Sequence, residues 1–376
     1  MKSILSIRGV RVLTIILLSL SVAYLLTVFS HIDFKTDSFF DGLSSAFGRT
    51  NDAFFLFLTS PLIRVLSGEI HFNMMSFSQW LNQTTPLIFT GLAISLVFNI
   101  GVLNLGAEGQ MFAGAVAGSC IAVFTPLPDL IHILLIFLVS AITGALWSVL
   151  PAYASYKKRN SEILVSLMMN YLAFYLGIYV IKRFIRDETS GALMSIKFAP
   201  SSAFPLINER YKLHVGFIFA ILLALIVWYL LKKTRWGLKI KMIGSNPQFA
   251  EYSGIHNKRA LINVQLISGA IAGTAGIFEL IGFHGRFLWS SSPGYGWDGI
   301  IVAIMASKNP IYVPLSAAFL AYIRVGAQNM GRYTDVSPDL VKIIQAIIII
   351  FLTTEGLFTS ESFHPSFRKL RGHFHG

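Results

Sequence analysis

The stretch TRWGLKIKMIGSNPQFAEYSGIHNKR, residues 234–259, is a polar island between two long apolar runs of the chain. It contains five basic residues and one acidic residue, so it is too polar to lie in the hydrocarbon of a membrane. Two further lysines precede it, and the whole loop therefore covers 232–259. We interpret this loop as a connector between two membrane-crossing segments.

A short helix is predicted inside this loop by its end signals. Ser245 and Asn246 are residue types that cap the start of a helix, and Pro247 suits the first helical position. About two turns follow over 248–253, and Gly254 is placed to end them. Two interpretations stay open: a solvated basic loop on the inner side of a membrane, or a docking helix that another protein grips.

The composition identifies the class of protein. Of the 376 residues, 54% are hydrophobic and only 13% are charged, and the mean hydropathy is +0.65. A soluble domain is about 45–50% apolar and about a quarter charged. The single cysteine, Cys120, lies in an apolar run, which excludes a disulfide within the chain and argues against a metal cluster. We predict an all-α, polytopic membrane protein with one transmembrane domain over 1–376.

Ten segments are apolar enough to be read as membrane helices. They lie at about 10–29, 86–103, 106–124, 130–153, 162–181, 215–231, 260–283, 299–306, 311–327 and 340–352. The region 33–80 is predicted to be an extracytoplasmic or interfacial insertion, because its apolar run 53–66 is short and is broken by Pro61 and Arg64. We interpret that run as an interfacial or re-entrant helix.

The charges give the orientation. If the N-terminus is inside and every segment crosses, the inside regions hold 17 basic and five acidic residues. Almost all of the net charge of +12 then lies on one side, as the positive-inside rule expects, with both termini cytoplasmic. This distribution explains the basic balance without a nucleic-acid partner. Five segments precede the predicted extracytoplasmic loop 182–214 and five follow it, which predicts two inverted halves.

Catalytic motifs are absent from the sequence. It has no Gly-rich phosphate loop of the P-loop type, no His-Glu-x-x-His zinc motif and no Ser nucleophile elbow. We therefore predict that the chain is not an enzyme and that it binds no metal, nucleotide or other cofactor itself.

Polar residues within the apolar segments form the second candidate site. They cluster where one predicted helix gives way to the next, in FNIGVLNLGAEGQ at 98–110, whose glycines allow the backbone to break. Polar groups at membrane depth persist when they are buried in protein or face a water path. The predicted translocation-path residues are Asn99, Asn104, Glu108, Gln110, Asn170 and Glu279. An ordinary inside turn is the alternative for 98–110, and Asn170 could equally join two helices.

Glycines four residues apart predict close helix packing. Gly114 and Gly118 form one such pair, and Gly269 and Gly273 form another. Small residues at this spacing let two helices approach closely in lipid. The pattern concerns packing and does not indicate a function.

Four blocks of sequence resemble one family, the membrane permease subunits of bacterial ABC importers for nucleosides and simple sugars. The blocks are TPLIFTGLAISLVFNIGVLNLGAEGQMFAGA (85–115), NSEILVSLMMNYLAFY (160–175), TRWGLKIKMIGSNPQFAEYSGI (234–255) and GIFELIGFHGRF with SSPGYGWDGIIVAIMASKNP (276–310). They occur in the family's order, run through about two thirds of the chain and look most similar to nucleoside permeases.

The resemblance implies the partners and their roles. It implies a second permease subunit, a cytoplasmic ATPase that binds ATP and Mg²⁺, and an extracytoplasmic substrate-binding protein, all assembled at the bacterial inner membrane. It also implies that the capped helix couples to the ATPase. The coupling residues are then Gly244, Ser245, Asn246, Pro247, Ala250, Glu251, Tyr252 and Gly254.

Other functions remain open from the sequence. A secondary transporter of a similar substrate would need acidic relays inside the membrane, for which Glu279 and Glu108 are the candidates. An ABC importer of another small cargo, such as riboflavin, would have the same plan. A membrane enzyme or scaffold has no reactive group of residues to support it.

Overall fold

A computed structural model describes residues 2–32, 39–66, 69–124, 127–156 and 162–359. The chain divides into two compact units. One unit combines residues 1–80 with 321–376, and the other is continuous over 81–320. Two helices, α3 (Met74–Asn99) and α12 (Val313–Tyr333), contribute residues to both.

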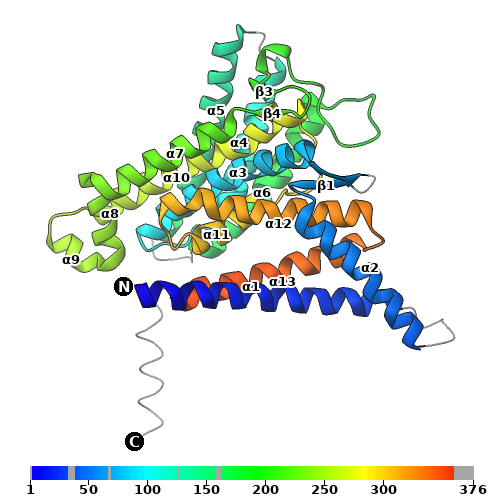
Figure 1. The fold of residues 1–376 in the computed structure, drawn as a ribbon. Helices are drawn as coiled ribbons and strands as arrows, with labels where there is room; N and C mark the ends of the chain where they lie inside the picture. The colour runs from blue at the N-terminus through cyan, green and yellow to red at the C-terminus, as the bar shows by residue number, and fades with distance from the viewer. Residues whose placement is uncertain (1, 33–38, 67–68, 125–126, 157–161, 360–376) are drawn as a thin grey trace, which may run out of the picture. The chain divides into compact units, whose positions relative to one another are not determined.

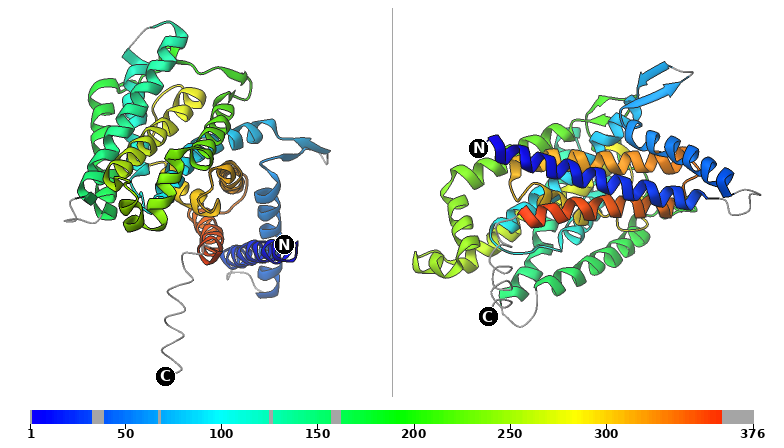
Figure 2. Two further views of the ribbon diagram at one scale, coloured as in Figure 1. Left: turned by 90° about the vertical axis from the view of Figure 1, so that its left-hand side faces the viewer. Right: turned by 60° about the horizontal axis from the view of Figure 1, so that its bottom comes forward.

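The first unit is built on three long helices. They are α1 (Lys2–His31), α2 (Phe39–Thr59) and α13 (Pro338–Thr359). Helix α1 packs against both of the others, and Figure 2 shows α1 and α13 lying side by side along their length. A two-stranded antiparallel sheet of β1 (Ile63–Leu66) and β2 (Glu69–Phe72) precedes α3.

The predicted helix over 53–66 is wrong in its extent. Helix α2 ends at Thr59, and the chain turns before it enters strand β1 at Ile63. Pro61 lies in that turn, and a proline there both lacks an N–H donor and disfavours helical geometry in the residue before it. The apolar run is therefore split between the end of a helix and the start of a strand.

The second unit holds the main helical bundle (Figure 1). Its helices are the rest of α3, α4 (Ala107–Phe124), α5 (Asp129–Tyr156), α6 (Glu162–Val180), α7 (Gly216–Lys233), α8 (Arg235–Ser245), α9 (Pro247–Tyr252), α10 (Asn257–Glu279), α11 (Tyr295–Met305) and the start of α12. Short elements join them: π-helical turns η1 (Ile181–Ile185) and η3 (Leu280–His284), 3₁₀ turns η2 (Pro200–Ser202) and η4 (Pro310–Tyr312), and the paired strands β3 (Leu206–Asn208) and β4 (Leu213–His214).

Glycines bring the backbones of α4, α5 and α10 into contact. A Cβ added at Gly114 of α4 would collide with the backbone of Gly273 of α10, and one at Gly144 of α5 would collide with the backbones of Gly269 and Gly273. This confirms that the small residues at four-residue spacing serve helix packing, because only glycine leaves room for such an approach. These three helices pack backbone to backbone in the second unit, while the other face of α5 stays exposed.

Seven helices among the described residues are long and apolar enough to cross a membrane. They are α3, α4, α5, α6 with η1, α7, α10 with η3, and η4 with α12. The chain is therefore a multi-pass membrane protein. The other three predicted segments coincide with α1, α11 and α13, and their crossing stays a prediction, as does the side on which each terminus lies.

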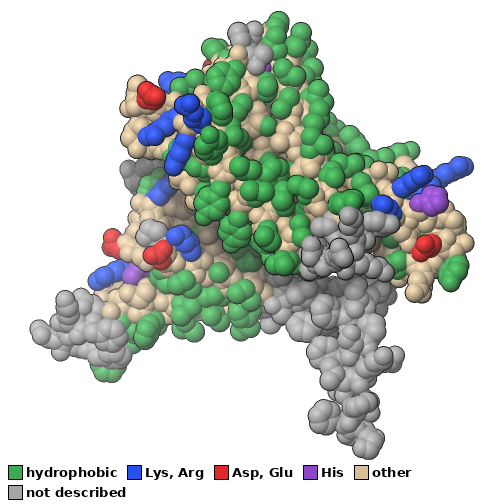
Figure 3. Space-filling model, turned by 180° about the vertical axis from the view of Figure 1, so that it is seen from behind, with side chains coloured by type: hydrophobic (Ala, Val, Ile, Leu, Met, Phe, Trp, Pro, Cys, Tyr) green, Lys and Arg blue, Asp and Glu red, His purple; other side chains and the backbone are tan. Residues whose placement is uncertain are grey.

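Hydrophobic and charged side chains occupy different parts of the surface of the second unit. In Figure 3, hydrophobic side chains cover a broad field, and charged side chains gather at its two ends. One of these ends is formed by α8 and α9, which also lie at one extremity of the bundle in Figure 1. This arrangement is the one expected of a bundle surrounded by lipid, with its polar ends in water.

Candidate functional site

The polar stretch that opens the sequence forms two helices. Only the second was predicted. The first, α8, begins at Thr234, whose hydroxyl accepts a hydrogen bond from the N–H of Gly237 at 3.2 Å. Ile240 and Ile243 are buried while the lysines of α8 lie toward the surface. This cap and the three-residue apolar spacing were the signals in the sequence that could have revealed α8.

Helix α9 has the predicted end signals, with one change. Asn246 is the cap, and its side-chain oxygen accepts from the N–H of Phe249 at 3.0 Å. Ser245 is instead the last residue of α8. Pro247 occupies the first turn of α9. Gly254, which follows the helix, has φ +77°, a left-handed conformation that favours glycine.

The two faces of α9 differ. Ala250 is fully buried against the chain's own helices, so it seats α9 and is not open to a partner. Phe249 and Tyr252 point outward, with 59% and 92% of their surface exposed, and Glu251 is also exposed. A six-residue helix that is fixed at both ends thus presents two aromatic side chains to its surroundings.

Helix α8 ends directly on the end of α3. A Cβ added at Gly244 would collide with the carbonyl oxygen of Asn99, and one at Gly101, whose φ is +87°, would lie 3.4 Å from the Cα of Gly244. The Asn99 side chain donates to the carbonyl oxygen of Lys308 at 2.7 Å, in the turn between α11 and η4. The structure therefore places Asn99 in a backbone junction beside α8, away from the other predicted path residues.

Four of the predicted path residues come together at the start of α4. Asn104 donates to the side-chain oxygen of Gln110 and to the hydroxyl of Ser268, both at 3.4 Å, and accepts from the N–H of Gly106 at 2.9 Å. The Ser268 hydroxyl in turn donates to the carbonyl oxygen of Ala93 in α3 at 2.8 Å. This network ties α3, α4 and α10 together where the chain between α3 and α4 has no regular structure.

Asn170 of α6 supports the same break in the backbone. Its side-chain oxygen accepts from the N–H of Gly109, and its amide donates to the carbonyl oxygen of Leu105, each at 2.8 Å. Both partners are backbone groups that no helix satisfies, and an unsatisfied group of this kind is costly at membrane depth. The side chain therefore joins helices, which was one of the two roles left open for it.

Glu108 lies at the junction of two helix starts. Its carboxylate accepts hydrogen bonds from the hydroxyl of Ser292 and from the N–H groups of Gly294, at 2.8 Å, and Gly296. Those N–H groups lie at the N-terminus of α11, which is the positive end of the helix dipole. A negative side chain from α4 thus caps a helix almost two hundred residues further along the chain.

The position of this junction along the bundle follows from α3. Thr90 donates to the carbonyl oxygen of Tyr295 at 2.9 Å. Thr90 precedes the end of α3 by nine residues, or about 13 Å along the helix axis. A Cβ at Gly296 would meet the backbone of Glu108, so α4 and α11 both begin at this level. The junction therefore lies about 13 Å before the end of α3, inside the length of a helix that could cross a membrane.

Glu279 is separate from the group around Asn104. It lies eleven residues beyond Ser268 on α10, about 16 Å further along the axis. Its carboxylate meets the imidazole of His284 at 3.3 Å, and only 12% of its side-chain surface is exposed. The structure therefore brings together Asn104, Glu108, Gln110 and Asn170, and places Asn99 and Glu279 at opposite ends of the unit.

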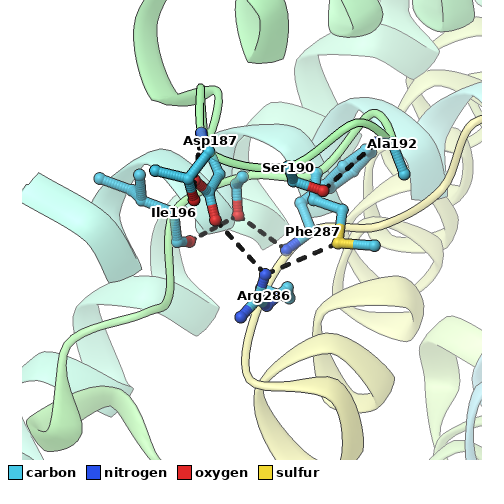
Figure 4. Close-up of polar contacts among 9 residues, drawn as sticks. Asp187, Ser190, Ala192, Ile196, Arg286 and Phe287 are labelled. Atoms are coloured by element: carbon cyan, nitrogen blue, oxygen red, sulfur yellow. Dashed lines mark hydrogen bonds and ion pairs between the residues drawn. The ribbon is translucent and has the colours of Figure 1, made fainter.

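The far end of the second unit is closed by the segment that follows η1. Figure 4 shows this segment on the chain around Arg286 and Phe287. Arg286 pairs with the carboxylate of Asp187 at 3.6 Å, and the N–H of Phe287 donates to the hydroxyl of Ser195 at 2.9 Å. The hydroxyl and the N–H of Thr189, together with Arg286, lower the pKa of the Asp187 carboxyl. This end is an ordered polar surface.

Sequence reasoning missed the partners of Glu108 and Asn104. Ser268, Ser292, Gly294 and Gly296 lie on α10 or just before and within α11. Serine and glycine are common in membrane helices, so their types carried no signal by themselves. The predicted eighth segment also began at Gly299, because Asp298 interrupts the apolar run, and the true start of α11 at Tyr295 was therefore not seen.

The sequence of this chain is similar to those of known transport proteins. Residues 76–353 match the family model described as the permease component of the branched-chain amino acid transport system. The guanosine ABC transporter permease protein NupP of Bacillus subtilis is 31% identical over 298 residues, covering 78% of this chain and 84% of that protein.

Two further relatives have the same extent. The glucose ABC transporter permease protein TsgB13 of Haloferax volcanii is 31% identical over 296 residues, covering 76% of this chain and 78% of that protein. The nucleoside ABC transporter permease protein NupB of Lactococcus lactis is 28% identical over 290 residues, covering 74% and 79%. The chain therefore belongs to the branched-chain amino acid transport system permease family, and it is a permease subunit of the ABC-transporter type.

Proposed function

We propose that this chain forms the translocation path of an ATP-driven importer and that α9 receives the motion of a separate ATPase. The cargo is a nucleoside or a simple sugar, which an extracytoplasmic binding protein delivers. The relatives that transport guanosine, nucleosides and glucose support this range of cargo. The chain itself catalyses no reaction and needs no bound cofactor, while ATP and Mg²⁺ bind to the ATPase.

The observation that carries the proposal is the contact between Gly244 and Asn99. A displacement of α9 moves the end of α8, and α8 meets the end of α3 backbone to backbone. Asn99 then connects α3 to the turn at Lys308, which follows α11. A displacement of α9 is thus passed to α3 and α11, and both of these helices also contact the junction around Glu108.

The polar junction is proposed to couple the helices that flank the path. Asn104, Glu108, Gln110 and Asn170 hold α3, α4, α6, α10 and α11 together inside the bundle. Each helix in this list has its own hydrogen bond to the junction, so a relative shift of any one of them is passed to the others. Glu279 and His284 would contribute a second polar contact nearer the binding protein.

The assembly follows from this arrangement. The α8–α9 end and both termini face the cytoplasm of a bacterium, and the surface around Asp187 and Arg286 faces outward and meets the binding protein. A second permease subunit, either identical or homologous, completes the path in the inner membrane. The lipid-facing surface and the separation of charged ends in Figure 3 support the orientation of the axis.

An ion-driven secondary transporter is the competing mechanism, and the geometry disfavours it. A proton or cation relay needs a carboxylate that changes partners. The Glu108 carboxylate is instead engaged by a hydroxyl and two backbone N–H groups that cap a helix. Protonation of this carboxylate would weaken it as the acceptor for these three donors.

Reconstitution tests the proposal. The full complex in proteoliposomes should accumulate nucleoside only when ATP is inside and the binding protein is outside, whereas this chain alone should neither hydrolyse ATP nor accumulate cargo. Accumulation by the isolated chain under an ion gradient would overturn the proposal in favour of secondary transport. Collapse of the ion gradient with an ionophore is the matched control, and it should leave ATP-driven uptake unchanged.

A further inference from the structure

Three tyrosines form a row along α6. Tyr171, Tyr175 and Tyr179 are four residues apart, so they lie on one face, about 6 Å from each to the next along the axis. Their exposed fractions are 69%, 68% and 61%. Within the described part of the chain, none of the three hydroxyls makes a hydrogen bond.

The opposite face of α6 packs on the second unit. Asn170, Ala173 and Gly177 are buried there, and a Cβ at Gly177 would meet the ring of Phe112 in α4. The tyrosine row therefore points away from the core of the chain. Its neighbours on the exposed side are apolar, namely Leu164, Met168, Leu172 and Leu176.

The depth of the row is unusual for tyrosine. The candidate span that contains it is Ile163–Ile185. Tyr171 and Tyr175 lie in its central turns, and only Tyr179 is close enough to an end for the aromatic belt of a membrane interface. A hydroxyl in the hydrocarbon has no water to bond with and leaves its desolvation uncompensated.

Two other peripheral helices show what a lipid-facing surface of this protein looks like. The exposed residues in the middle of α5 are Leu134, Leu138, Ile142 and Leu146. Those in the middle of α7 are Leu222, Leu225 and Ile226. All seven are hydrocarbon side chains. The tyrosine row therefore differs from the lipid-facing surfaces of the same molecule and faces a different environment.

We propose that the Tyr171–Tyr175–Tyr179 face of α6 lines the water-filled path and that its rings bind the base of a nucleoside in transit. This inference rests on the proposed function and specifies its substrate class. A tyrosine ring offers a flat surface on which a base stacks, and its hydroxyl can donate to or accept from the base edge. The face carries no charge between Ile163 and Ile181, which suits an uncharged cargo.

Cysteine accessibility in the assembled importer tests the proposal. In a Cys120→Ala background, Tyr171→Cys and Tyr175→Cys are compared with Leu138→Cys and Ile142→Cys, their counterparts in the middle of α5. A charged methanethiosulfonate reacts with a thiolate in water, so the two α6 positions should react at least about ten times faster than those on α5. Saturating guanosine should slow the reaction at 171 and 175, and glucose should not.

Each outcome decides the matter. Equal, slow labelling at α5 and α6 positions would show that the row is not in contact with water and would overturn the proposal. Fast labelling that guanosine does not slow would overturn the assignment of the base to these rings, and protection by glucose alone would replace the nucleoside with a sugar.

A conservative variant guards against misfolding. Tyr171→Phe keeps the ring and should preserve stacking, while Tyr171→Leu removes it and should raise the KM for guanosine uptake about ten-fold or more. Equal KM values for the two variants would overturn the stacking. The unlabelled parent complex is assayed for ATP-dependent uptake in parallel, so that a failure of the proposed function is recognised separately from a failure of this inference.

Discussion

The backbone of Gly244 lies against the carbonyl oxygen of Asn99, with no side chain between α8 and the end of α3. A contact of this kind transmits displacement directly, because there is no flexible group to absorb it. It links the element that is exposed at the end of the bundle to a helix that reaches the polar junction.

Replacement of Gly244 with alanine should therefore weaken energy coupling. The added Cβ has to displace the Asn99 carbonyl, so α8 shifts relative to α3. Substrate-stimulated ATPase activity of the full complex should fall by about 2- to 30-fold, which corresponds to roughly 0.5–2 kcal/mol of coupling free energy. Gly48→Ala is the matched control, because a Cβ at this exposed position of α2 meets nothing within 4 Å. Wild-type stimulation in Gly244→Ala would remove the contact from the coupling route.

The exposed aromatic residues of α9 should carry the affinity for the ATPase. Tyr252→Asp and Phe249→Asp should each weaken binding of the ATPase subunit by about 2 kcal/mol or more, or roughly 30-fold in Kd, because aromatic anchors dominate interfaces. Glu251→Ala should have a much smaller effect, since a charge at the rim mainly tunes association. Ala250→Trp is not an equivalent test, because Ala250 is buried under the helix itself. Co-purification with the ATPase checks the result, and equal effects at 251 and 252 would contradict it.

Loss of the Glu108 charge should destabilise the start of α11. Glu108→Gln keeps the size of the side chain but replaces one acceptor oxygen with a donor, which faces the N–H groups of Gly294 and Gly296. We expect a loss of about 1–3 kcal/mol in unfolding free energy and a large loss of transport. Glu279→Gln, whose partner is His284, should reduce stability less. Thermal unfolding in detergent compares the two, and the reverse order would show that Glu108 is not the cap of α11.

Low pH should destabilise the end of the second unit that contains His214. Burial lowers the pKa of this histidine from 6.5 to about 4. Its Nδ1 accepts from the N–H of Gly216 at 3.1 Å, and the ring of Phe204 and the backbone of Gly282 lie beside it. The unfolded chain therefore binds a proton at a higher pH than the folded chain does. Stability is complete above pH 6.5, falls between 6.5 and 4, and is about 2 kcal/mol lower at pH 5.

The control for this pH dependence is His214→Asn. Its amide oxygen can still accept from Gly216, but it does not titrate. The variant should lose less stability than the wild type between pH 7 and pH 5 in the same unfolding measurement. An unchanged pH dependence in His214→Asn would assign the effect to other groups.

Orientation can be tested with two exposed positions. In a Cys120→Ala background, Ala192→Cys should react with an impermeant thiol reagent from outside intact spheroplasts, and Ser245→Cys should react only after the membrane is opened. Both positions are exposed, whereas Ser201 is less suitable because its hydroxyl bonds His132 at 2.8 Å. Equal labelling of both from outside would contradict the ten-segment topology.

Local signals in the sequence predicted the helices well. The apolar runs over 106–124 and 130–153 correspond closely to α4 and α5, because about 20 apolar residues are what a bilayer requires. The Asn246, Pro247 and Gly254 signals predicted α9, because caps act within a few residues. Helix α8 was missed because its lysines resembled a loop, although its buried Ile240 and Ile243 had helical spacing.

The sequence identified the polar residues of the candidate site but not their partners. Polar side chains among apolar ones marked Asn104, Glu108 and Asn170, because such residues are costly in lipid. Their partners were not visible, since Glu108 meets Ser292 and Gly294 across a separation that no local pattern encodes. Asn99 carried the same signal as Asn104, yet it lies at the end of α3 and holds the Lys308 turn. Type and spacing identify candidates, and only the tertiary fold separates them.

The glycine contacts among α4, α5 and α10 also determine which parts of this protein can evolve. Where backbones touch, any other residue at Gly114, Gly144 or Gly273 would force the helices apart. We therefore expect relatives with different cargoes to retain the close packing of these three helices. Substitutions are tolerated where side chains separate the helices. New substrate preferences should therefore arise on α6 and in the segment before α11, while the packing of α4, α5 and α10 stays the same.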